Sequence, residues 1–568
     1  MNPDAPETFR FAPPYALPTF PVTRSAELDG RPRRHRIVIL GGGLAGLTLA
    51  CDLAQRGIDA VLLDEDDTVG VRGASSRGIC YAQKSLEIFA RLGLYDRIVD
   101  KGVTWSIGKT YSGDTEVYRF NLRTDSDSVQ PPFVNLQQFY LEWFLVDRIT
   151  ELGTVELRWK NRVTQVDLHD DHARVGVATP FGDYTLEADY LIDATGANSP
   201  WPKQFGIDAH ASRSTDRWCI SDVRFKTPLP MERWTWVDAD FNEGRAVWQH
   251  LMADEVWRMD YQMAEDCDVA YITRPEVTGA RLRAQLGPDV EFEFVWIGPY
   301  GYRDHLLETF RRGPLFFIGD AAHVVSPFGA RGGNSGIQDA GNLGWKLAMV
   351  VRGDARPALL DSYHAERHPA AIENLRVTGR TARFIAPRSP AEHRLRRAVV
   401  ALARHHEFAR GLVNTGRMSQ PNAYPPSSFL PDGARSVQNL PMRWSDGCSD
   451  TLMTLLAEAT SFVLLWFAPG RDAWRQARTA IAGLALRLVP IGGDVDGPSV
   501  EDHDGAWTRH LKAAPGTACL IRPDGYLAAT LASVDGPTIV TAFATATGAS
   551  LPVTGNALLT TSLTGAFA

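Results

Sequence analysis

A glycine-rich turn near the start of the chain restricts the fold more than any other feature of the sequence. The run RIVIL, at residues 36–40, has the β-branched character of a buried strand, and the GGGLAG that follows it opens LTLACDLAQRG, which predicts a helix ended by glycine. Gly41, Gly43 and Gly46 have the G-x-G-x-x-G spacing, and Asp64 ends a second strand, IDAVLLDED. Strand, turn, helix and spaced acid together predict a dinucleotide-binding βαβ unit.

Each residue type in this unit has a physical role. The glycines let the backbone approach a pyrophosphate, the helix N-terminus offers N–H groups and the positive end of its dipole, and the carboxylate can accept ribose hydroxyls. Both FAD and NAD are bound by such units. The remainder of the chain must therefore decide between the two cofactors.

A second glycine-rich segment, LFFIGDAAHVVSPFGARGGNSGIQDAGNLGWKLAMVV, occupies residues 315–351. A strand there delivers Gly319 and Asp320, whose carboxylate can accept the hydroxyls of a polyol. Pro327 can lie against a flat ring without donating a hydrogen bond. A helix beginning near Asn334 would aim its first N–H groups at an edge where negative charge accumulates. These residue types predict a loop that holds a ligand with a polyol chain and a flat ring, and its many glycines predict a pliant wall.

These two segments resemble those of class A FAD-dependent aromatic hydroxylases, the p-hydroxybenzoate hydroxylase-like family, and most of all its phenol hydroxylase-type members. Two further stretches are similar to the same family. SSRGICYAQKSLEIFARLGLYDRI, at residues 75–98, predicts an amphipathic helix preceded by Arg77, which the resemblance implies contacts FAD. NLQQFYLEWFL, at residues 135–145, implies Gln138 as a cofactor ligand, with Gln137 as the alternative.

The resemblance implies a complete cofactor assignment and a reaction. Asp320 would bind the ribityl chain of FAD, Pro327 would lie beside the isoalloxazine, and Gly332, Gly333 and Asn334 would face its N1/C2=O edge. NAD(P)H would reduce the flavin, and O2 would add to give a C4a-hydroperoxide that transfers oxygen to an electron-rich ring. The expected substrate is a small aromatic or phenolic compound.

One segment departs from the family pattern. Where the family has an Asp-Gly motif, this chain reads IDATGANSPWPK, with Thr195 in place of the acid and Pro202 in place of an arginine. Since the sequence contains no second G-x-G-x-x-G, NAD(P)H is expected to bind transiently on the flavin domain rather than in a Rossmann domain of its own.

The sequence predicts an α/β protein with a Rossmann-like FAD-binding domain, an antiparallel-sheet substrate domain and a thioredoxin-like C-terminal domain. We expect a proline-rich arm that is poorly structured or wraps the surface, an FAD-binding domain in two parts, a substrate-binding sheet and a C-terminal domain. In chain order these are residues 1–35 (arm), 36–200 (FAD-binding), 201–310 (substrate sheet), 311–424 (second FAD-binding part and helical linker) and 425–568 (C-terminal domain).

The predicted substrate sheet is rich in tryptophan, which suits stacking on an aromatic ring. Its strands also carry polar groups that could touch a phenolate or a carboxylate, and the sequence does not choose among them: Arg245, His250, Arg258 and Tyr261. The base that would deprotonate a phenol is not identified. In the C-terminal domain the absence of a CxxC pair predicts a redox-inactive, structural unit that could serve as a homodimer surface.

Composition excludes several classes of function. With 59 basic and 67 acidic residues, the net charge of −8 is mild and does not indicate nucleic acid as a partner. The six cysteines form no metal-spaced cluster, so we expect no metal and a reduced, cytoplasmic protein. No apolar run reaches the ~18 residues of a membrane span, so we expect a protein that is not integral to a membrane.

Two alternatives to aromatic hydroxylation remain open at the level of sequence. One is an FAD oxidoreductase of the same fold that performs epoxidation, dehydrogenation or reduction of a polyketide or an N-heteroaromatic compound. The other is a flavin-binding protein without turnover, for which Thr195 is the only support.

Overall fold

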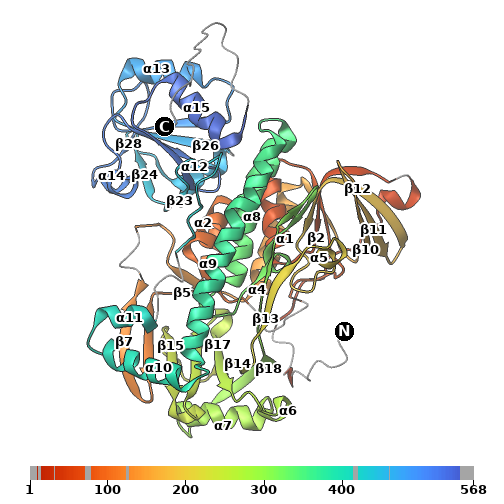
Figure 1. Ribbon diagram of the computed structural model, residues 1–568, viewed down its shortest axis with the longest axis vertical. Helices are drawn as coiled ribbons and strands as arrows, with labels where there is room; N and C mark the ends of the chain where they lie inside the picture. Colours follow the sequence, from red (N-terminus) through yellow and green to blue (C-terminus); the bar gives the residue numbers. More distant parts are fainter. Residues whose placement is uncertain are drawn as a thin grey trace, which may run out of the picture.

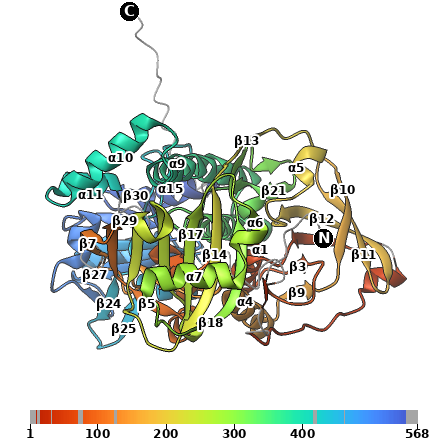
Figure 2. The same cartoon turned by 90° about the horizontal axis from the view of Figure 1, so that it is seen from below.

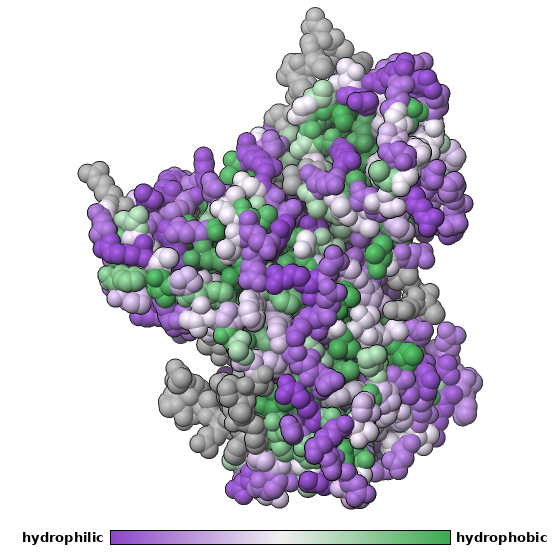
Figure 3. Space-filling model, turned by 180° about the vertical axis from the view of Figure 1, so that it is seen from behind, coloured by the Kyte–Doolittle hydropathy of each residue, from purple (hydrophilic) through white to green (hydrophobic). Residues whose placement is uncertain are grey.

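The computed structural model describes residues 9–10, 15–30, 32–70, 78–122, 127–413, 420–459 and 461–549. Three bodies are visible in Figure 1: the FAD-binding region with the long helices α8 and α9 at the centre, the predicted substrate sheet below it, and the C-terminal domain above. No helix in these ranges is long and apolar enough to cross a membrane. The rear surface is mainly hydrophilic, with hydrophobic residues in scattered groups (Figure 3).

The FAD-binding region is built on a parallel sheet. β2 lies between β3 and β12, as the dinucleotide-binding unit requires, and its residues Ile37–Leu40 are fully buried. The parallel strands are β2 (Arg34–Leu40), β3 (Ala60–Leu63), β9 (Val155–Arg158), β12 (Gly182–Asp193) and β21 (Leu315–Phe317). Antiparallel extensions are β10 (Arg162–Leu168), β11 (Ala173–Thr179) and β20 (Arg311–Arg312).

The helices of this region cover both faces of the sheet. They are α1 (Leu44–Gln55), α2 (Gln83–Arg91), α3 (Tyr95–Lys101), α4 (Gln138–Leu152), α5 (Trp201–Gln204), α8 (Gly332–Arg352) and α9 (Asp361–Ile385). The single helix predicted for residues 75–98 was wrong: a strand, β4 (Cys80–Ala82), precedes α2, and a turn at Gly93 (φ +75°) separates α2 from α3. A small sheet joins β4 to β8 (Phe133–Asn135) and β5 (Val103–Trp105).

The N-terminal arm, where it is described, wraps the surface and is anchored by specific contacts. The Tyr15 ring packs 4.5 Å from Phe139, and Phe20 stacks on Trp159 at 4.6 Å. A 3-10 turn at Ala26–Asp29 buries Glu27, which accepts a hydrogen bond from Arg158. Further upstream, β1 (Phe9–Arg10) adds to the edge of the substrate sheet.

The sheet predicted to be antiparallel has eight strands in the order β1-β18-β14-β17-β16-β15-β6-β7, and one neighbouring pair, β15 and β6, is parallel. Two of its strands, β6 (Ile107–Ser112) and β7 (Thr115–Asn121), come from residues that the sequence placed in the FAD-binding domain. The others are β14 (Arg217–Phe225), β15 (Arg233–Ala239), β16 (Arg245–Leu251), β17 (Val256–Met263) and β18 (Phe292–Tyr300). Helix α7 (Pro275–Leu286), with the short α6 (Val269–Ile272), packs on one face, and Figure 2 shows α7 lying across these strands.

Short strands connect the substrate sheet to the flavin loop. β13 (Ala209–Arg213) and β22 (His323–Val324) flank β19 (Arg303–Leu307) in a three-stranded sheet. Beyond α9, helices α10 (Pro390–Ala403) and α11 (Glu407–Val413) form a hairpin against the β7 edge of the substrate sheet.

The C-terminal domain is built around a βαβ unit followed by an antiparallel hairpin and a helix. Its four central strands have the order β30-β29-β26-β27, with β26 and β27 parallel and β29 antiparallel to β26, which is a thioredoxin-like arrangement. The strands of its sheet are β23 (Arg435–Ser436), β24 (Pro441–Trp444), β25 (Ser449–Thr451), β26 (Phe462–Phe467), β27 (Leu486–Ile491), β28 (Val500–Glu501), β29 (Ala518–Ile521) and β30 (Tyr526–Leu531). Its helices are α12 (Leu452–Ala459), α13 (Arg471–Ala480), α14 (Ala506–Leu511) and α15 (Gly536–Thr547).

A buried group of charges fixes this domain to α8 and α9. Arg522, at the end of β29, donates to both carboxylate oxygens of Glu366 on α9, at 2.8 and 2.9 Å, and also pairs with Asp524. Lys346 on α8 donates to Glu366 at 2.9 Å. These side chains are at most 4% exposed, so the C-terminal domain is attached to the helices behind the flavin loop through a fully enclosed ion cluster.

Candidate active site

The three glycines of the G-x-G-x-x-G turn, Gly41, Gly43 and Gly46, have different structural roles. A Cβ at Gly41 (φ +101°) would lie 2.7 Å from the Ala194 carbonyl oxygen, and a Cβ at Gly46 would lie 2.0 Å from the Gly41 carbonyl oxygen. Both positions need glycine for packing. At Gly43 a Cβ would meet nothing within 4 Å, and its φ of −82° suits any residue. The space above Gly43 is therefore open, as a bound pyrophosphate would require.

Asp64 closes the other side of this turn. One carboxylate oxygen accepts the Gly42 N–H at 2.5 Å and the other accepts the Asp66 N–H at 2.8 Å. Burial raises the pKa of Asp64 from its ordinary value. The acid thus lies at the carboxyl end of β3, next to the N-terminus of α1, where the sequence predicted a ribose ligand.

The second glycine-rich loop brings another helix N-terminus to the same place. A Cβ at Gly319 (φ +59°) would lie 2.9 Å from the Ala45 Cβ, and one at Gly336 would lie 3.2 Å from the same atom. The N-terminal turns of α1 and α8 therefore lie in contact, separated only by small residues. Neither N-cap residue caps its helix with its own side chain. At α1 the Leu44 N–H is bonded to Glu142, whereas the first N–H groups of α8 can serve a ligand.

The loop residues predicted to face the flavin are the accessible part of an otherwise buried segment. Asp320 and Gly333 are exposed and Pro327 and Gly332 are half-buried, whereas residues 334–337 are buried. Gly332 and Gly333 are already helical; the left-handed backbone lies at Gly329 (φ +91°) and Ala330 (φ +54°). The left-handed corner of the loop is thus at Gly329–Ala330, and the glycines at 332, 333 and 336 belong to helix α8.

Asn334 holds the loop by its side chain. Its Oδ1 accepts the Ala82 N–H at 2.9 Å and the Ser85 hydroxyl at 2.6 Å, and its Nδ2 donates to the Cys80 carbonyl at 2.8 Å and to the Ala330 carbonyl. With these four bonds made inside the protein, only the backbone N–H of Asn334 remains for a cofactor.

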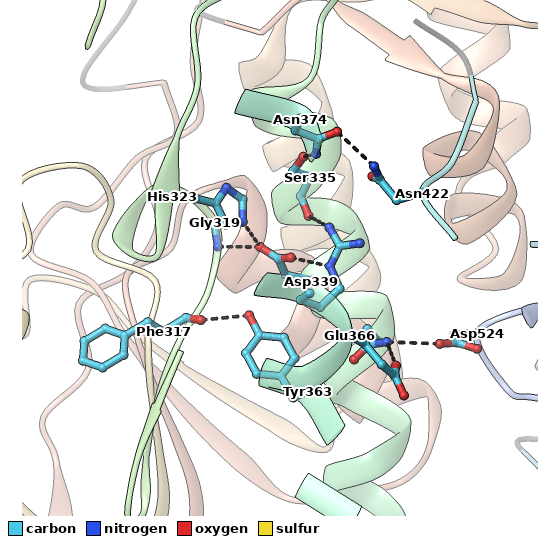
Figure 4. Close-up of polar contacts among 12 residues, drawn as sticks. Phe317, Gly319, His323, Ser335, Asp339, Tyr363, Glu366, Asn374, Asn422 and Asp524 are labelled. Atoms are coloured by element: carbon cyan, nitrogen blue, oxygen red, sulfur yellow. Dashed lines mark hydrogen bonds and ion pairs between the residues drawn. The ribbon is translucent and has the colours of Figure 1, made fainter. Parts of the chain in front are cut away.

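Asp339, one turn further along α8, fixes the strand end that presents Asp320 (Figure 4). One Asp339 oxygen accepts the Gly319 N–H at 3.0 Å and lies 2.7 Å from His323 Nε2; the other accepts Arg367 Nε at 2.7 Å. The His323 and Arg367 charges lower the pKa of Asp339 to about 2, against the opposing effect of burial. The sequence reading missed this residue, although an acid inside the apolar run of α8 was a signal of buried pairing.

The two glutamines take different roles. Gln138 accepts the N–H of Gly78, the residue that follows Arg77 in the chain, at 3.2 Å, and donates to Glu142 at 2.8 Å. Gln137 donates instead to the Tyr15 hydroxyl and the Ala253 carbonyl, so it anchors the N-terminal arm. Arg77 itself lies outside the described residues.

Glu142 is a second residue that the sequence reading missed. It is 5% exposed and accepts hydrogen bonds from Gln138, the Gly70 N–H and the Leu44 N–H at the start of α1. Burial raises its pKa to about 7. A carboxyl group that is readily protonated beside the α1 N-terminus is compatible with a neighbouring pyrophosphate, whereas an ionised one would repel it.

The segment DATG lies at the end of β12, beside the G-x-G-x-x-G turn. The buried Asp193 accepts the Thr195 N–H and hydroxyl at 3.0 and 2.6 Å and the Ser199 hydroxyl at 2.5 Å. Thr195, which stands where the family has an acid, therefore turns back onto Asp193. A cleft of about 280 Å³ lies next to it, lined in part by Gly196, Lys203 and Ala321.

The substrate sheet turns an aromatic cluster toward the flavin loop. Trp218 on β14 and Trp248 on β16 stack at 5.0 Å. Phe328, which follows Pro327 in the loop, meets Trp248 edge-on at 4.9 Å and Tyr302 at 5.2 Å. The Arg233 guanidinium lies over the Trp248 ring at 6.0 Å. Loop and sheet thus share a wall of aromatic rings.

The strand register separates the four polar candidates between two faces. His250 pairs across the ladder with Arg258, on the same face as Trp248. Tyr261 lies on the opposite face, where its hydroxyl donates to Gln285 of α7 at 2.7 Å, and Arg245 starts β16 in an ion pair with Glu243. The structure therefore does not bring Tyr261 and Arg245 to the face of the aromatic cluster.

Of the two on that face, Arg258 is already committed to Asp222 through two hydrogen bonds of 2.8 Å. His250 is 5% exposed, its Nδ1 has no partner among the described residues, and its Nε2 is 3.9 Å from Asp260. Burial and the neighbouring Arg233 and Arg258 cations lower the pKa of His250 well below its usual range. Burial raises the pKa of Asp260 to about 7.

This arrangement defines a class of protein before any comparison is made. Two helix N-termini, two acids at strand ends and open space above Gly43 fit an FAD, and an aromatic-walled sheet packs against the second glycine-rich loop. The chain belongs to the FAD binding domain family, whose model matches residues 34–378.

Individual relatives are similar in sequence to this chain over most of its length. It is 28% identical to 6-methylpretetramide 4-monooxygenase of Streptomyces rimosus, over 89% of this chain and 91% of the relative, and 28% identical to the 3-(3-hydroxy-phenyl)propionate/3-hydroxycinnamic acid hydroxylase of Mycolicibacterium smegmatis, over 62% and 61%. The solved structure of OxyS anhydrotetracycline hydroxylase from Streptomyces rimosus superposes with a TM-score of 0.70 at 27% identity, covering 91% of this chain and 99% of that one. The protein is an FAD-dependent aromatic monooxygenase, and NAD(P)H is the usual reductant of its family.

Proposed function

We propose that FAD binds across the carboxyl ends of β2, β3 and β21, with its reactive ring beneath the substrate sheet. Gly41, Gly43 and Gly46 with the α1 N-terminus would hold the pyrophosphate, and Asp64 the adenosine ribose. Asp320 would accept ribityl hydroxyls. Pro327 and the N–H groups of Gly332, Gly333 and Asn334 would contact the ring, and Gln138 would hold Gly78, the residue that follows Arg77.

The bound flavin supplies the redox chemistry: it takes two electrons from NAD(P)H and uses them with O2. One oxygen atom enters the aromatic ring in place of hydrogen, and the other leaves as water. The protein binds and orients the substrate, excludes water and stabilises charge as it develops.

The proposed substrate is a phenolic compound with one or more fused aromatic rings. Its support is the face that carries Trp218, Trp248 and His250: stacked rings for an aromatic body, next to buried nitrogens that have no partner within the described chain. Unpaired buried polar atoms are costly, so a ligand that supplies hydrogen bonds there would be bound specifically. The fused-ring class is supported by the relatives named for 6-methylpretetramide and anhydrotetracycline.

His250 and Asp260 are the proposed proton-handling pair. The neutral imidazole can accept a hydrogen bond from the phenol hydroxyl at Nδ1, and once the phenol has lost its proton the enriched ring reacts more readily with an electrophilic oxygen. Asp260, with a pKa of about 7, can exchange a proton near neutral pH, and Arg233 provides a cation for the resulting phenolate.

A substrate screen tests the proposal. The FAD-loaded protein is mixed with NADH or NADPH and with single-ring or fused-ring phenols. Oxygen uptake is recorded, and the masses of the products are measured by mass spectrometry. We expect at least about tenfold faster NAD(P)H consumption with a fitting phenol, equivalent to ~1.4 kcal/mol of barrier, and a product heavier by one oxygen atom. Equal rates with every compound, and no oxygenated product, would contradict it.

A further inference from the structure

The hairpin of α10 and α11 carries an unusual share of exposed apolar side chains. The described chain exposes nine large hydrophobic residues, and four of them fall within these two helices: Leu395 (61%), Leu402 (42%), Phe408 (67%) and Leu412 (56%). A concentration of this kind marks an interaction surface, whereas single exposed apolar residues are ordinary.

The fold does not need these four side chains. The inner side of α10 is already filled by Val400 and Ala403, which pack with Val237 of the substrate sheet. Arg396, also on the inner side, donates to the Val237 and Ile385 carbonyls at 3.0 Å. A helix with one buried apolar side has no structural reason to present a second one to solvent.

The second side has helical spacing. Ala391, Leu395, Ala398 and Leu402 are all exposed and follow one another at intervals of four, three and four residues. They form a continuous apolar stripe along the four turns of α10. The stripe leads toward α11, which adds Phe408 and Leu412.

The stripe is bordered by positive charge. Residues 388–412 contain six arginines, three histidines and two glutamates, in a chain whose net charge is −8. Arg394, Arg397 and Arg404 are exposed, and their side chains make no hydrogen bond or ion pair within the described chain. A second copy of this surface would bring like charges together, which opposes self-association and favours an anionic partner.

The hairpin also projects from the molecule. In both Figure 1 and Figure 2, α10 and α11 lie at the outer edge, beyond the β7 edge of the substrate sheet. Both helices therefore lie at the periphery of the molecule, where their exposed side chains can be reached from outside.

We propose that the α10–α11 hairpin docks this protein on an anionic lipid surface. The four exposed apolar side chains enter the interfacial region, and Arg394, Arg397 and Arg404 contact lipid phosphates. Because α10 closes one edge of the substrate sheet, docking places that sheet next to the lipid phase, from which apolar compounds partition. The docking itself does not depend on the proposed substrate or on catalysis.

Vesicle flotation with the full-length, FAD-loaded protein tests the proposal. Binding to phosphatidylcholine vesicles is compared with binding to vesicles that also contain phosphatidylglycerol. We expect binding to the anionic vesicles only, weakened by salt because the Debye length shrinks from ~10 Å at 0.1 M to ~3 Å at 1 M. Leu402→Ser with Phe408→Ser should weaken it by at least about tenfold, and so should Arg394→Gln with Arg397→Gln.

Phe181→Ser is the matched control, since Phe181 is 47% exposed on the distant β11–β12 turn. It should leave vesicle binding unchanged, and FAD absorbance and thermal midpoint should show that every variant is folded. Three results would overturn the proposal: no binding to anionic vesicles, equal binding by all variants, or a dimer in sedimentation that Leu402→Ser dissociates. The arginine variants decide the matter if the apolar variants fail to fold.

Discussion

Two polar regions of this protein are both buried, but their polar atoms differ in whether they have hydrogen-bond partners. Where the C-terminal domain meets α8 and α9, Glu366, Lys346, Arg522 and Asp524 pair with one another, and none of their described polar atoms is left without a partner. On the face of the substrate sheet that carries the aromatic cluster, three buried nitrogens have no hydrogen-bond partner among the described residues: the indole nitrogens of Trp218 and Trp248 and Nδ1 of His250. The first region is complete without a ligand, and the second is not.

An unpaired indole alone does not carry this distinction. Trp466 and Trp474, in the core of the C-terminal domain, also bury indole nitrogens that have no partner in the described structure. Around them lie apolar side chains. Around Trp248 lie the Arg233 cation, the neutral His250 and the protonatable Asp260, so several polar groups converge on one place. Convergence of polar groups is the more informative sign of a site.

Glu366→Gln should produce the largest effect, because it leaves Arg522 and Lys346 without their shared carboxylate in a buried interface. We expect a loss of about 3–5 kcal/mol in the free energy of unfolding, measured by urea denaturation. Glu373→Gln on the same helix is the control: its partner Arg376 is 51% exposed, so the cost should be below ~1 kcal/mol. Similar costs for both variants would show that the cluster is not the fixed element described above.

Asp320→Ala should weaken FAD binding by about 1–3 kcal/mol, the cost of leaving ribityl hydroxyls and their surroundings unpaired. Flavin fluorescence during titration of the apoprotein measures it. Asp361→Ala, an exposed acid at the start of α9 that pairs with Arg311, should have no effect. Unchanged FAD affinity in Asp320→Ala would place the ribityl ligand elsewhere.

Asp260 should make the protein less stable as pH rises from about 4 to about 7. In that window the folded carboxyl, with its raised pKa, holds a proton that the unfolded chain releases, so the free energy of unfolding falls with pH by up to ~1.4 kcal/mol per unit. Asp260→Asn removes this contribution. The difference between the two unfolding curves across the window isolates it, and parallel curves would mean that Asp260 titrates normally.

His250→Phe should have the smallest effect on stability, because it exchanges an unpaired buried polar ring for an apolar one. We expect a change within ~1 kcal/mol, of either sign, together with about tenfold slower substrate-stimulated NAD(P)H oxidation. Trp474→Phe, which also removes an unpaired nitrogen, should leave turnover unchanged. A large loss of stability in His250→Phe would assign His250 to the structure rather than to the substrate.

The local parts of the site could be predicted from the sequence, and the non-local parts could not. Gly41, Gly43, Gly46 and Asp64 are recognisable because a βαβ turn is specified within thirty residues. Which of Arg245, His250, Arg258 and Tyr261 faces the flavin loop depends on strand register, and an antiparallel strand covered on both faces gives no alternation that distinguishes them.

The support behind the flavin loop shows the same limit. Asp339 and Arg367 are 28 residues apart, and Arg522 reaches Glu366 across 156 residues. Charged residues within the apolar run of α8 are a sign of buried pairing that the sequence reading missed, and the partners are chosen by tertiary packing. The boundary between α2 and α3 is a different case, since Gly93 was visible in the sequence and its left-handed turn was not anticipated.

The pairing of β21 with β12 determines when this chain can fold during synthesis. β12 ends at Asp193 and β21 begins at Leu315, so about 120 residues, including most of the substrate sheet, are translated between two neighbouring strands of one sheet. At ~5–20 residues per second that interval lasts roughly 6–24 seconds. Throughout it, the edge of β12 that will receive β21 is exposed in the nascent chain, so chaperone occupancy and translation speed over this stretch should govern the yield of native protein more than the stability of the finished fold does.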